Sequence, residues 1–369
     1  NEAGISTKEL SDKFIAAFME DTGQLGIKPA TQNPRVINYM DEIIAFVSTL
    51  VDKGFAYVSE GDVYFRVAKS NNYAKLANKT LEDLEIGASG RTDAETERKE
   101  NPLDFALWKA AKEGEVSWDS PWGPGRPGWH IECSVMATEI LGDTIDIHGG
   151  GADLEFPHHT NEIAQSEAKT GKTFANYWMH NGFVNVDNEK MSKSLGNFVT
   201  VHDMLQTVDG QVLRFFLATQ QYRKPINFTE KAIHDAEVNL KYLKNTHSLP
   251  LTEQVNQAEL QTYLDTFQEA MDDDFNTANG VTVLFDMAKW INSGNYDQTV
   301  KDAFEKMLQV FGIVFEEEVL DEDIEKLIEE RQAARANKDF ATADRIRDEL
   351  AAQGIKLLDT KEGVRWTRD

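Results

Sequence analysis

The stretch "TIDIHGGGADLEFPHHTNEIAQSEAKTG" (residues 144–171) decides the fold class. Its first five residues are apolar and β-branched enough to predict a short buried strand. Three glycines and Asp153 then form a predicted loop. The remainder predicts a helix, with Pro157 in its first turn and Gly171 at its end. A strand, a glycine loop and a helix in this order are typical of an α/β fold.

The N-terminal side of this stretch predicts three helices, at residues 8–20, 34–53 and 131–141, and a hairpin at residues 55–67. In the second helix, apolar residues recur at helical spacing between Pro34, near its first turn, and Gly54, which ends it. The hairpin turns near Glu60 and Gly61. Residues 120–129, "SPWGPGRPGW", contain too much proline and glycine for a helix or a strand.

On the C-terminal side, "YWMHNGFVNV" (177–186) predicts a strand that leads into a loop with two lysines, "KMSKSLGNF" (190–198). Helical patterns then run from about residue 229 to about residue 312. The tail, residues 321–369, is denser in lysine and arginine and predicts two helices and a hairpin. A chain of 369 residues with these changes in pattern is expected to fold as several domains.

The composition narrows the classes of protein. A formal net charge of −25 argues against a general binder of polyanions, although a local basic face can still bind nucleic acid. Cys133 is the only cysteine, so no disulfide can form within the chain, and we expect a reducing compartment, the cytoplasm. Because no apolar run reaches membrane-spanning length, we expect no membrane partner.

The glycine loop is a candidate binding site for a nucleotide. Gly149 and Gly150 follow a predicted parallel strand, where the absence of side chains lets a ring or a phosphate approach the backbone. Asp153, just beyond, is placed to accept hydrogen bonds from ribose hydroxyls. The alternative is a plain turn between strand and helix, because glycine runs are weak signals.

A second pattern concerns metal ligands. His158 and Glu162 are four residues apart on the predicted helix, so they share a face. With Cys133 they supply ligands that zinc accepts, and three protein ligands with an open position form the catalytic arrangement. His159 is an alternative ligand or a substrate contact, and Trp129 either walls a pocket beside this set or fills the core. Taken alone, the same residues also fit a buried cysteine beside a surface His–Glu pair.

The lysine loop carries Lys190 and Lys193. Attack on a nucleoside triphosphate builds negative charge on phosphoryl oxygens, and positioned ammonium groups stabilise that charge. A flexible loop can close over a bound nucleotide and open again. Without such a partner, a loop of lysine and serine is a solvated turn.

Together these segments resemble the class I aminoacyl-tRNA synthetases, whose signature loop reads "KMSKS", and among them the cysteinyl-tRNA synthetases. The segments that carry the resemblance are "PWGPGRPGWHIECS", "DIHGGGADLEFPHHTNEIAQSEA", "YWMHNGFV", "KMSKSLGNF", "MDDDFNTA" and "GVRW". They occur in the order found in the family, over nearly all of the chain.

The resemblance implies an α/β fold: a partial Rossmann-type catalytic domain with an inserted connective peptide, then a mainly α-helical bundle and a small mixed α/β C-terminal domain. The implied domains are the remainder of the first Rossmann half (1–43), the connective peptide insertion (44–125), the second Rossmann half (126–175), a stem-contact fold with the KMSKS loop (176–228), the helical bundle (229–320) and an anticodon-binding domain (321–369).

The resemblance also implies a reaction. Cysteine is activated with ATP and Mg²⁺ to cysteinyl-adenylate and passed to tRNA(Cys), by an enzyme expected to be a monomer. The family binds one zinc ion through two cysteines, a histidine and a glutamate, and Cys133, His158 and Glu162 match three of these.

Further positions match other parts of the family site. Asp153 matches the aspartate that contacts the nucleotide after the glycines Gly149 and Gly150. Lys193 matches the ATP-binding lysine, with Lys190 as its catalytic neighbour. Trp129 matches the tryptophan of the substrate pocket, to which we also assign His159.

Two departures from the family pattern stand out. Thr160 replaces the first glutamate of the usual "HHENE". The family's first zinc cysteine and its H-I-G-H-type motif have no counterpart in these residues, so we expect the 369 residues by themselves to be catalytically incomplete. Two alternatives stay open: a related ligase that joins cysteine to an amino-sugar and lacks the tail, and a non-catalytic tRNA-binding fragment.

Overall fold

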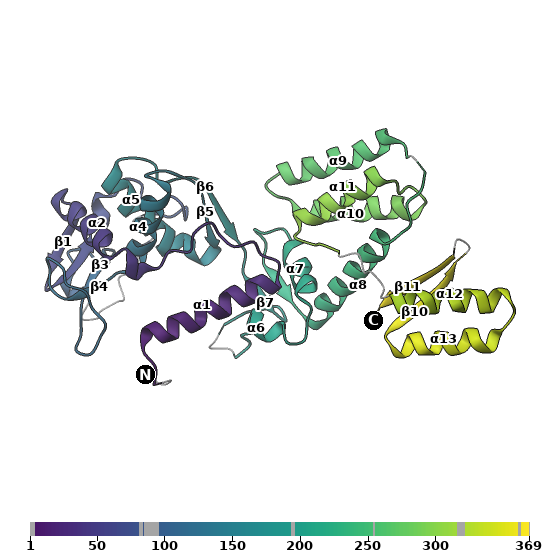
Figure 1. Ribbon diagram of the computed structural model, residues 1–369. Coiled ribbons are helices and arrows are strands. Elements are labelled where there is room, and N and C mark those ends of the chain that lie inside the picture. The colour runs from purple at the N-terminus through teal and green to yellow at the C-terminus, as the bar shows by residue number, and fades with distance from the viewer. Residues whose placement is uncertain are drawn as a thin grey trace. The chain divides into compact units, whose positions relative to one another are not determined.

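The computed structural model describes residues 4–80, 84, 96–192, 196–253, 255–315, 322–360 and 363–368. The chain divides into two compact units, Asn1–Ile313 and Val314–Asp369. In the first unit the helices are α1 (Thr7–Gln24), α2 (Met40–Asp52), α4 (Trp129–Leu141), α5 (Thr160–Thr170), α6 (Val201–Met204), α7 (Gly210–Ala218), α8 (Glu230–His247), α9 (Gln257–Asp272), α10 (Thr277–Asn292) and α11 (Gln298–Val310) (Figure 1).

The strands of the first unit are β1 (Ala56–Ser59), β2 (Asp62–Phe65), β3 (Phe105–Ala110), β4 (Gly125–Pro127), β5 (Ile145–Gly151), β6 (Ala175–Asn181), β7 (Val184–Val186), β8 (Glu189–Lys190) and β9 (Ile226–Phe228). They form three sheets. β1 to β4 make an antiparallel sheet in sequence order, β5 pairs with β6 in parallel, and β7 lies between antiparallel β8 and parallel β9. β5, α5 and β6 thus form a βαβ unit, and the predicted α/β class is confirmed.

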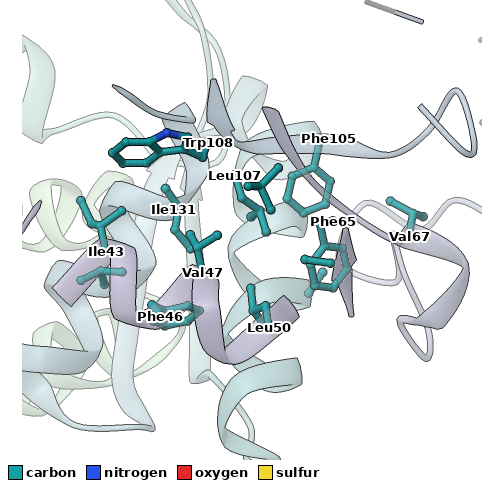
Figure 2. Close-up of a cluster of buried hydrophobic side chains, with 14 of the residues drawn as sticks. Ile43, Phe46, Val47, Leu50, Phe65, Val67, Phe105, Leu107, Trp108 and Ile131 are labelled. Atoms are coloured by element: carbon teal, nitrogen blue, oxygen red, sulfur yellow. The ribbon is translucent and has the colours of Figure 1, made fainter. Parts of the chain in front are cut away.

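One hydrophobic core joins the β1–β4 sheet to the helices of the candidate site. Its members shown in Figure 2 include Ile43, Phe46, Val47 and Leu50 on α2, Phe65 on β2, Leu107 and Trp108 on β3, and Ile131 on α4. Ala164 on α5 belongs to the same core. Full burial of such a large side chain contributes about 1.5–3 kcal/mol. The core therefore fixes α4 and α5 against each other, and with them the backbones of Cys133 and Glu162.

The predicted N-terminal elements are confirmed with different bounds. α1 continues to Gln24 instead of ending at residue 20. The predicted helix at 34–53 begins only at Met40, because an extended Arg35 and a 3-10 turn at Val36–Asn38 precede it. Pro34 is therefore not in the first turn of α2. The hairpin of β1 and β2 forms where it was predicted.

The prediction that residues 120–129 contain no strand is wrong, because β4 lies within them. β4 pairs with β3 along one edge, and Trp108 lies opposite Pro127. A proline is tolerated in such a short edge strand because no ladder bond from its nitrogen is required on the outer side. Gly125 is required for close packing, since a Cβ there would lie 2.2 Å from Nε1 of Trp108.

Around the glycine stretch, the strand β5 and the helix α5 have different bounds from those predicted. β5 runs through Gly151, so the three glycines belong to the strand instead of a loop, and Ile147 is exposed instead of buried. α5 begins at Thr160, and residues 155–159 form a separate π-helical turn. Phe156 has extended backbone angles there (φ −142°, ψ 128°), as residues before proline favour. The predicted end of the helix at Gly171 is confirmed, with φ 71°.

The second unit contains α12 (Glu322–Ala336), α13 (Phe340–Ala352) and the hairpin of β10 (Ile355–Thr360) and β11 (Gly363–Arg368), as predicted (Figure 1). Trp366 packs against its core. Arginines of the second unit form ion pairs with nearby carboxylates. These pairs are Arg331 and Arg335 with Asp359, Arg345 with Glu349, and Arg347 with Asp344 and Asp348.

Replacement of Asp359 is predicted to loosen the second unit. Nη1 and Nη2 of the buried Arg331 donate to the two carboxylate oxygens at 2.9 and 3.0 Å, and these bonds lower the pKa of Asp359. Asp359→Asn should lower the free energy of unfolding of this unit by about 1–2 kcal/mol at neutral pH. Loss of a fully buried ion pair would cost more, but Asp359 is 40% exposed. Because the folded-state pKa is depressed, the stabilisation is present above the unfolded-state pKa and is lost as the pH falls through the folded-state value.

Amide hydrogen exchange of α12 and β10 in the whole chain measures this effect. We expect faster exchange in Asp359→Asn at pH 7 and convergence with the parent in strong acid. Glu349→Gln, which removes an exposed helix pair with Arg345, serves as the control and should change little. Equal exchange in Asp359→Asn and the parent at pH 7 would contradict the assignment.

Candidate functional site

The glycines of β5 allow side chains to lie directly on the strand. Gly150 pairs with His180 of β6 in the parallel ladder. A Cβ on Gly150 would lie 2.9 Å from Cε1 of His159 and 2.9 Å from Cδ1 of Leu154. The ring of His159 therefore packs where a larger residue on β5 would place its side chain.

The nucleotide candidates Gly149, Gly150 and Asp153 lie together at the carboxyl end of β5. Asp153 is exposed in a 3-10 turn, Ala152–Leu154, that follows the strand directly. A Cβ on Gly151 would lie 2.4 Å from Oδ1 of Asp153, so this glycine lets the carboxylate fold back over the strand end. An accessible backbone edge with one exposed carboxylate suits a ligand that carries hydroxyl groups.

The three predicted metal ligands are brought together. One ligand atom each of Cys133, His158 and Glu162 lies within 4.8 Å of the others. Nε2 of His158 lies 2.8 Å from Oε1 of Glu162, as the four-residue spacing predicted. Glu162 is completely buried, and its Oε1 has no well-aligned hydrogen-bond partner in the described part of the chain.

These residues fit a zinc ion. A buried carboxylate oxygen without an aligned donor, beside a thiol and a ring nitrogen, is the donor set that zinc accepts. Burial, followed by the charges of Glu162 and Glu132, raises the pKa of the Cys133 thiol to about 12. A bound cation would reverse that shift, because a coordinating thiol loses its proton.

The Glu162 carboxylate stays ionised in spite of its burial. Burial alone would raise its pKa, but the His148 and His158 rings close to its two oxygens outweigh this and lower the pKa to about 2. Nε2 of His148 lies 2.6 Å from Oε2. One oxygen thus faces β5 and the other faces His158, so the carboxylate is held from two sides.

Three site histidines were not identified from the sequence: His130, His148 and His180. Nδ1 of His130 lies 2.8 Å from Nδ1 of His158, and Nε2 of His180 lies 2.8 Å from Nδ1 of His159. Five of the eight histidines in the chain gather here, and that density near the glycine stretch was an available signal. Ligand atoms of His148, His159 and Glu162 also lie within 4.8 Å of one another, so His159 belongs to a second possible ligand set.

The helix α4 positions Cys133 and Trp129. Oγ of Ser134 donates to the carbonyl of Glu162 at 3.2 Å, and Nε2 of Gln165 donates to Oγ of Ser134 at 2.7 Å, so α4 and α5 are bonded next to the ligands. Trp129 is 59% exposed, which excludes a core role. Its ring stacks on that of His158 with centroids 4.3 Å apart, so the indole forms one wall beside the ligand set.

The lysine loop follows a tight hairpin. Asp187 and Asn188, with φ of 49° and 67°, form a two-residue turn between β7 and β8 of the kind that type I′ hairpins use. Lys190 ends β8, is exposed, and places its Nζ 4.1 Å from the centroid of the Phe183 ring. The other lysine of the loop, Lys193, lies outside the described residues. The side chain of Asn197 accepts from the amide of Ser192 at 2.9 Å and so bridges the loop.

Family comparisons cover most of the chain. Residues 1–238 match "tRNA synthetases class I (C) catalytic domain", residues 266–316 match "DALR domain", and residues 317–366 match "Cysteinyl-tRNA ligase anticodon binding domain". The chain belongs to the cysteine–tRNA ligase family. The predicted family and fold class are confirmed.

Individual relatives are close. The chain is 95% identical over 369 residues to the cysteine–tRNA ligase of Streptococcus thermophilus strain CNRZ 1066, covering all of this chain and 83% of that protein. Against the cysteine–tRNA ligase of Streptococcus agalactiae serotype III the identity is 80%, with 82% of the relative covered. Among solved structures, methionyl-tRNA synthetase of Mycobacterium tuberculosis with methionyl-adenylate has a TM-score of 0.57 at 15% identity, covering 84% of this chain and 77% of that one. This last likeness concerns the fold alone.

In this member of the cysteine–tRNA ligase family, Gly150→Ala is predicted to disturb the site by overpacking. The added methyl would press on His159 and Leu154 at 2.9 Å, a contact that requires the ring to move. Such overpacking costs about 1–3 kcal/mol. Urea unfolding measures the loss. Gly23→Ala, where the methyl meets nothing within 4 Å, is the matched control, and equal stability of the two variants would disprove the close packing.

Proposed function

We propose that the protein activates L-cysteine with ATP and transfers the cysteinyl group to tRNA(Cys). The observation that supports this best is the convergence of Cys133, His158 and Glu162 within 4.8 Å, beside the exposed Trp129, in a chain of the cysteine–tRNA ligase family. In the first step the cysteine carboxylate attacks the α-phosphorus of ATP and pyrophosphate leaves. In the second step a ribose hydroxyl at the tRNA 3′ end attacks the cysteinyl carbonyl and AMP leaves.

The proposed zinc ligands would serve to select cysteine over serine. Cysteine and serine are nearly isosteric, and shape alone separates such pairs poorly. Zinc, when bound, favours a thiolate over a hydroxyl and lowers the pKa of the thiol. Cys133, His158 and Glu162 would hold it, while Trp129 and His159 line the space for the amino acid. The approaches of His148 and His158 to Glu162 keep that carboxylate charged and oriented.

The nucleotide would lie along the carboxyl end of β5. Gly149 and Gly150 leave room for the adenosine, and Asp153 accepts from ribose hydroxyls. Lys190 and Lys193 offset the negative charge that develops on the phosphates, with Mg²⁺ accompanying ATP as the substrate complex. The hairpin turn at Asp187 and Asn188 positions the start of the loop.

The tRNA would contact the part of the chain that follows the lysine loop. Residues 317–366 match a family of anticodon-binding domains, which supports tRNA over an amino-sugar as the acceptor. The six-domain division, the monomeric state and the cytoplasmic location stay predictions. In the described residues no helix is both long and apolar enough to cross a membrane.

The direct test is cysteine-dependent exchange of pyrophosphate into ATP, followed by charging of tRNA(Cys). We expect both activities in a protein extended to the length of its relatives, with serine inactive. The expectation that the 369 residues alone do not activate cysteine stays a prediction, and the same assay on the shorter chain tests it. Charging of an amino-sugar in place of tRNA would favour the alternative ligase.

Loss of a ligand is predicted to release zinc. Cys133→Ala and His158→Ala should each weaken zinc binding at least about 100-fold, more than the loss of a supporting group outside the ligand set costs. Zinc content after dialysis and competition with a chelator measure the affinity. Glu139→Gln, on the same helix at an exposed position, is the control. A parent protein without zinc, or unchanged affinity in Cys133→Ala, would contradict the assignment.

Replacement of the loop lysine is predicted to slow activation. Lys193→Ala should raise the barrier to adenylate formation by about 2–4 kcal/mol, because a positioned charge on the transition state is lost. Binding of cysteine should change little. Pyrophosphate exchange at saturating cysteine measures the rate, and Lys231→Ala, in an exposed helix pair with Asp235, is the control. Near-parental exchange in Lys193→Ala would refute the role of the loop.

A further inference from the structure

The turn between α9 and α10 has a strained backbone, because two residues with side chains occupy positions of positive φ that glycine usually takes. It lies in the segment "MDDDFNTA" (residues 271–278), to which the candidate site gives no role. Asp274 and Phe275 follow each other with φ of 54° and 52°. Helix ends of this kind generally place glycine in the left-handed region, and a bulky residue such as Phe275 is an outlier there. The conformation persists because surrounding contacts hold it.

The carboxylate of Asp274 accepts hydrogen bonds from two side chains, Tyr222 and Arg223, in the segment between α7 and β9. Its Oδ1 accepts from the hydroxyl of Tyr222 at 2.8 Å, and its Oδ2 accepts from Nε of Arg223 at 2.5 Å. The hydrogen bond from Arg223 lowers the pKa of Asp274, so the carboxylate is charged at neutral pH. Oγ1 of Thr277 donates to the carbonyl of Gln220 at 2.7 Å. The turn is thus fastened to residues 220–223 at several points.

Residues 220–226 in turn hold the connection between the site and the lysine loop. That connection is Gly182, which joins β6 to β7. Its amide donates to the carbonyl of Tyr222 at 2.7 Å, and a Cβ on it would lie 2.4 Å from the carbonyl of Lys224. His180 of the site lies two residues before Gly182, and Lys190 lies at the end of the hairpin that begins with β7. The Asp274 clamp, defined as Asp274 with Tyr222 and Arg223, therefore attaches to the backbone between these two groups.

A second attachment of the bundle exists at α7. Nε of Arg214 donates to the carbonyl of Phe311, at the end of α11, at 2.9 Å. A Cβ on Gly312 would lie 2.5 Å from Nη2 of Arg214, so the contact is close. The helix α8 also packs against α7, α10 and α11, and so joins the bundle to the rest of the unit. The Asp274 clamp adds an attachment at the α9–α10 turn, and several separated attachments together fix the orientation of α9–α11.

We propose that Asp274 is a positioning residue for the transfer step: its clamp fixes the orientation of α9–α11 relative to β6–β9, and bound tRNA needs that orientation to present its 3′ end to the adenylate. This inference rests on the proposed function. Its basis in the chain is that residues 317–366, which match the anticodon-binding family, follow α11 directly in the sequence. The described bonds of Asp274 reach Tyr222 and Arg223 and none of the residues proposed to activate cysteine, so we assign Asp274 to the transfer step.

The test compares three variants of the protein extended to the length of its relatives. Asp274→Gly removes the carboxylate while suiting the left-handed backbone, so it should fold at least as well as the parent. Asp274→Asn keeps the hydrogen bond from Tyr222 but loses the ion pair. Asp272→Asn is the control, because Asp272 is bonded only to Gln268 in the described contacts, at 3.4 Å.

We expect Asp274→Gly to raise the KM for tRNA(Cys) in charging by about tenfold, the size of effect that one lost charge-assisted contact produces. Asp274→Asn should lie between Asp274→Gly and the parent. Cysteine-dependent pyrophosphate exchange should stay within about twofold in all three variants, because the described bonds of Asp274 do not reach the ligand set and the variants leave the bond between Gly182 and the Tyr222 carbonyl in place. A parallel fall of exchange and charging, or equal behaviour of Asp274→Gly and Asp272→Asn, would overturn it.

Amide hydrogen exchange at Gly182 and residues 220–226 gives a readout that does not depend on activity. Asp274→Gly should accelerate exchange there, because the segment loses its attachment to α9–α11, and Asp272→Asn should not. Unchanged exchange at Gly182 would overturn the inference even if charging is impaired. If the parent protein shows no pyrophosphate exchange, the proposed function is contradicted but the clamp is not. The amide measurement still decides whether Asp274 holds Gly182 and residues 220–226.

Discussion

The buried carboxylate of Glu162 is the constraint on which the candidate site depends. An unpaired buried carboxylate is too costly to retain, so its surroundings must supply donors or a cation. His148 on β5 and His158 before α5 approach its two oxygens at 2.6 and 2.8 Å. These approaches require β5 and α5 to lie close together, which Gly150 permits by leaving space for His159. The core shared by α2, the β1–β4 sheet and α4 then brings Cys133 to the same place.

Most of the fold could be predicted from the sequence because its helices and hairpins have local signals. The tail helices, the helical region after residue 229 and the β1–β2 hairpin follow apolar spacing and turn residues. The errors occurred where neighbours in space decide the structure. β4 is a strand because β3 offers a ladder and Gly125 fits against Trp108, and the glycines of β5 are strand because β6 pairs with them. No local pattern contains that information.

In the candidate site, too, features with a local sequence signal were predicted and those set by neighbours in space were not. The pairing of His158 with Glu162 followed from a spacing of four residues, and the lysine loop followed from its composition. His130, His148 and His180 come from α4, β5 and β6, so only the packing of three separate elements brings their rings together. The exposure of Trp129 could not be predicted from the sequence either, because an isolated tryptophan in a glycine-rich stretch fits a core as well as a pocket wall.

X-ray absorption at the zinc edge, with and without cysteine, tests the central claim most directly. The account predicts zinc bound by sulfur from Cys133 together with nitrogen and oxygen ligands, because the three ligand atoms lie within 4.8 Å of one another. Addition of cysteine should add one sulfur neighbour at about 2.3 Å, the usual zinc–thiolate distance, and serine should leave the spectrum unchanged. A spectrum that does not respond to cysteine, in a protein that holds zinc, would show that the ligand set does not select the substrate.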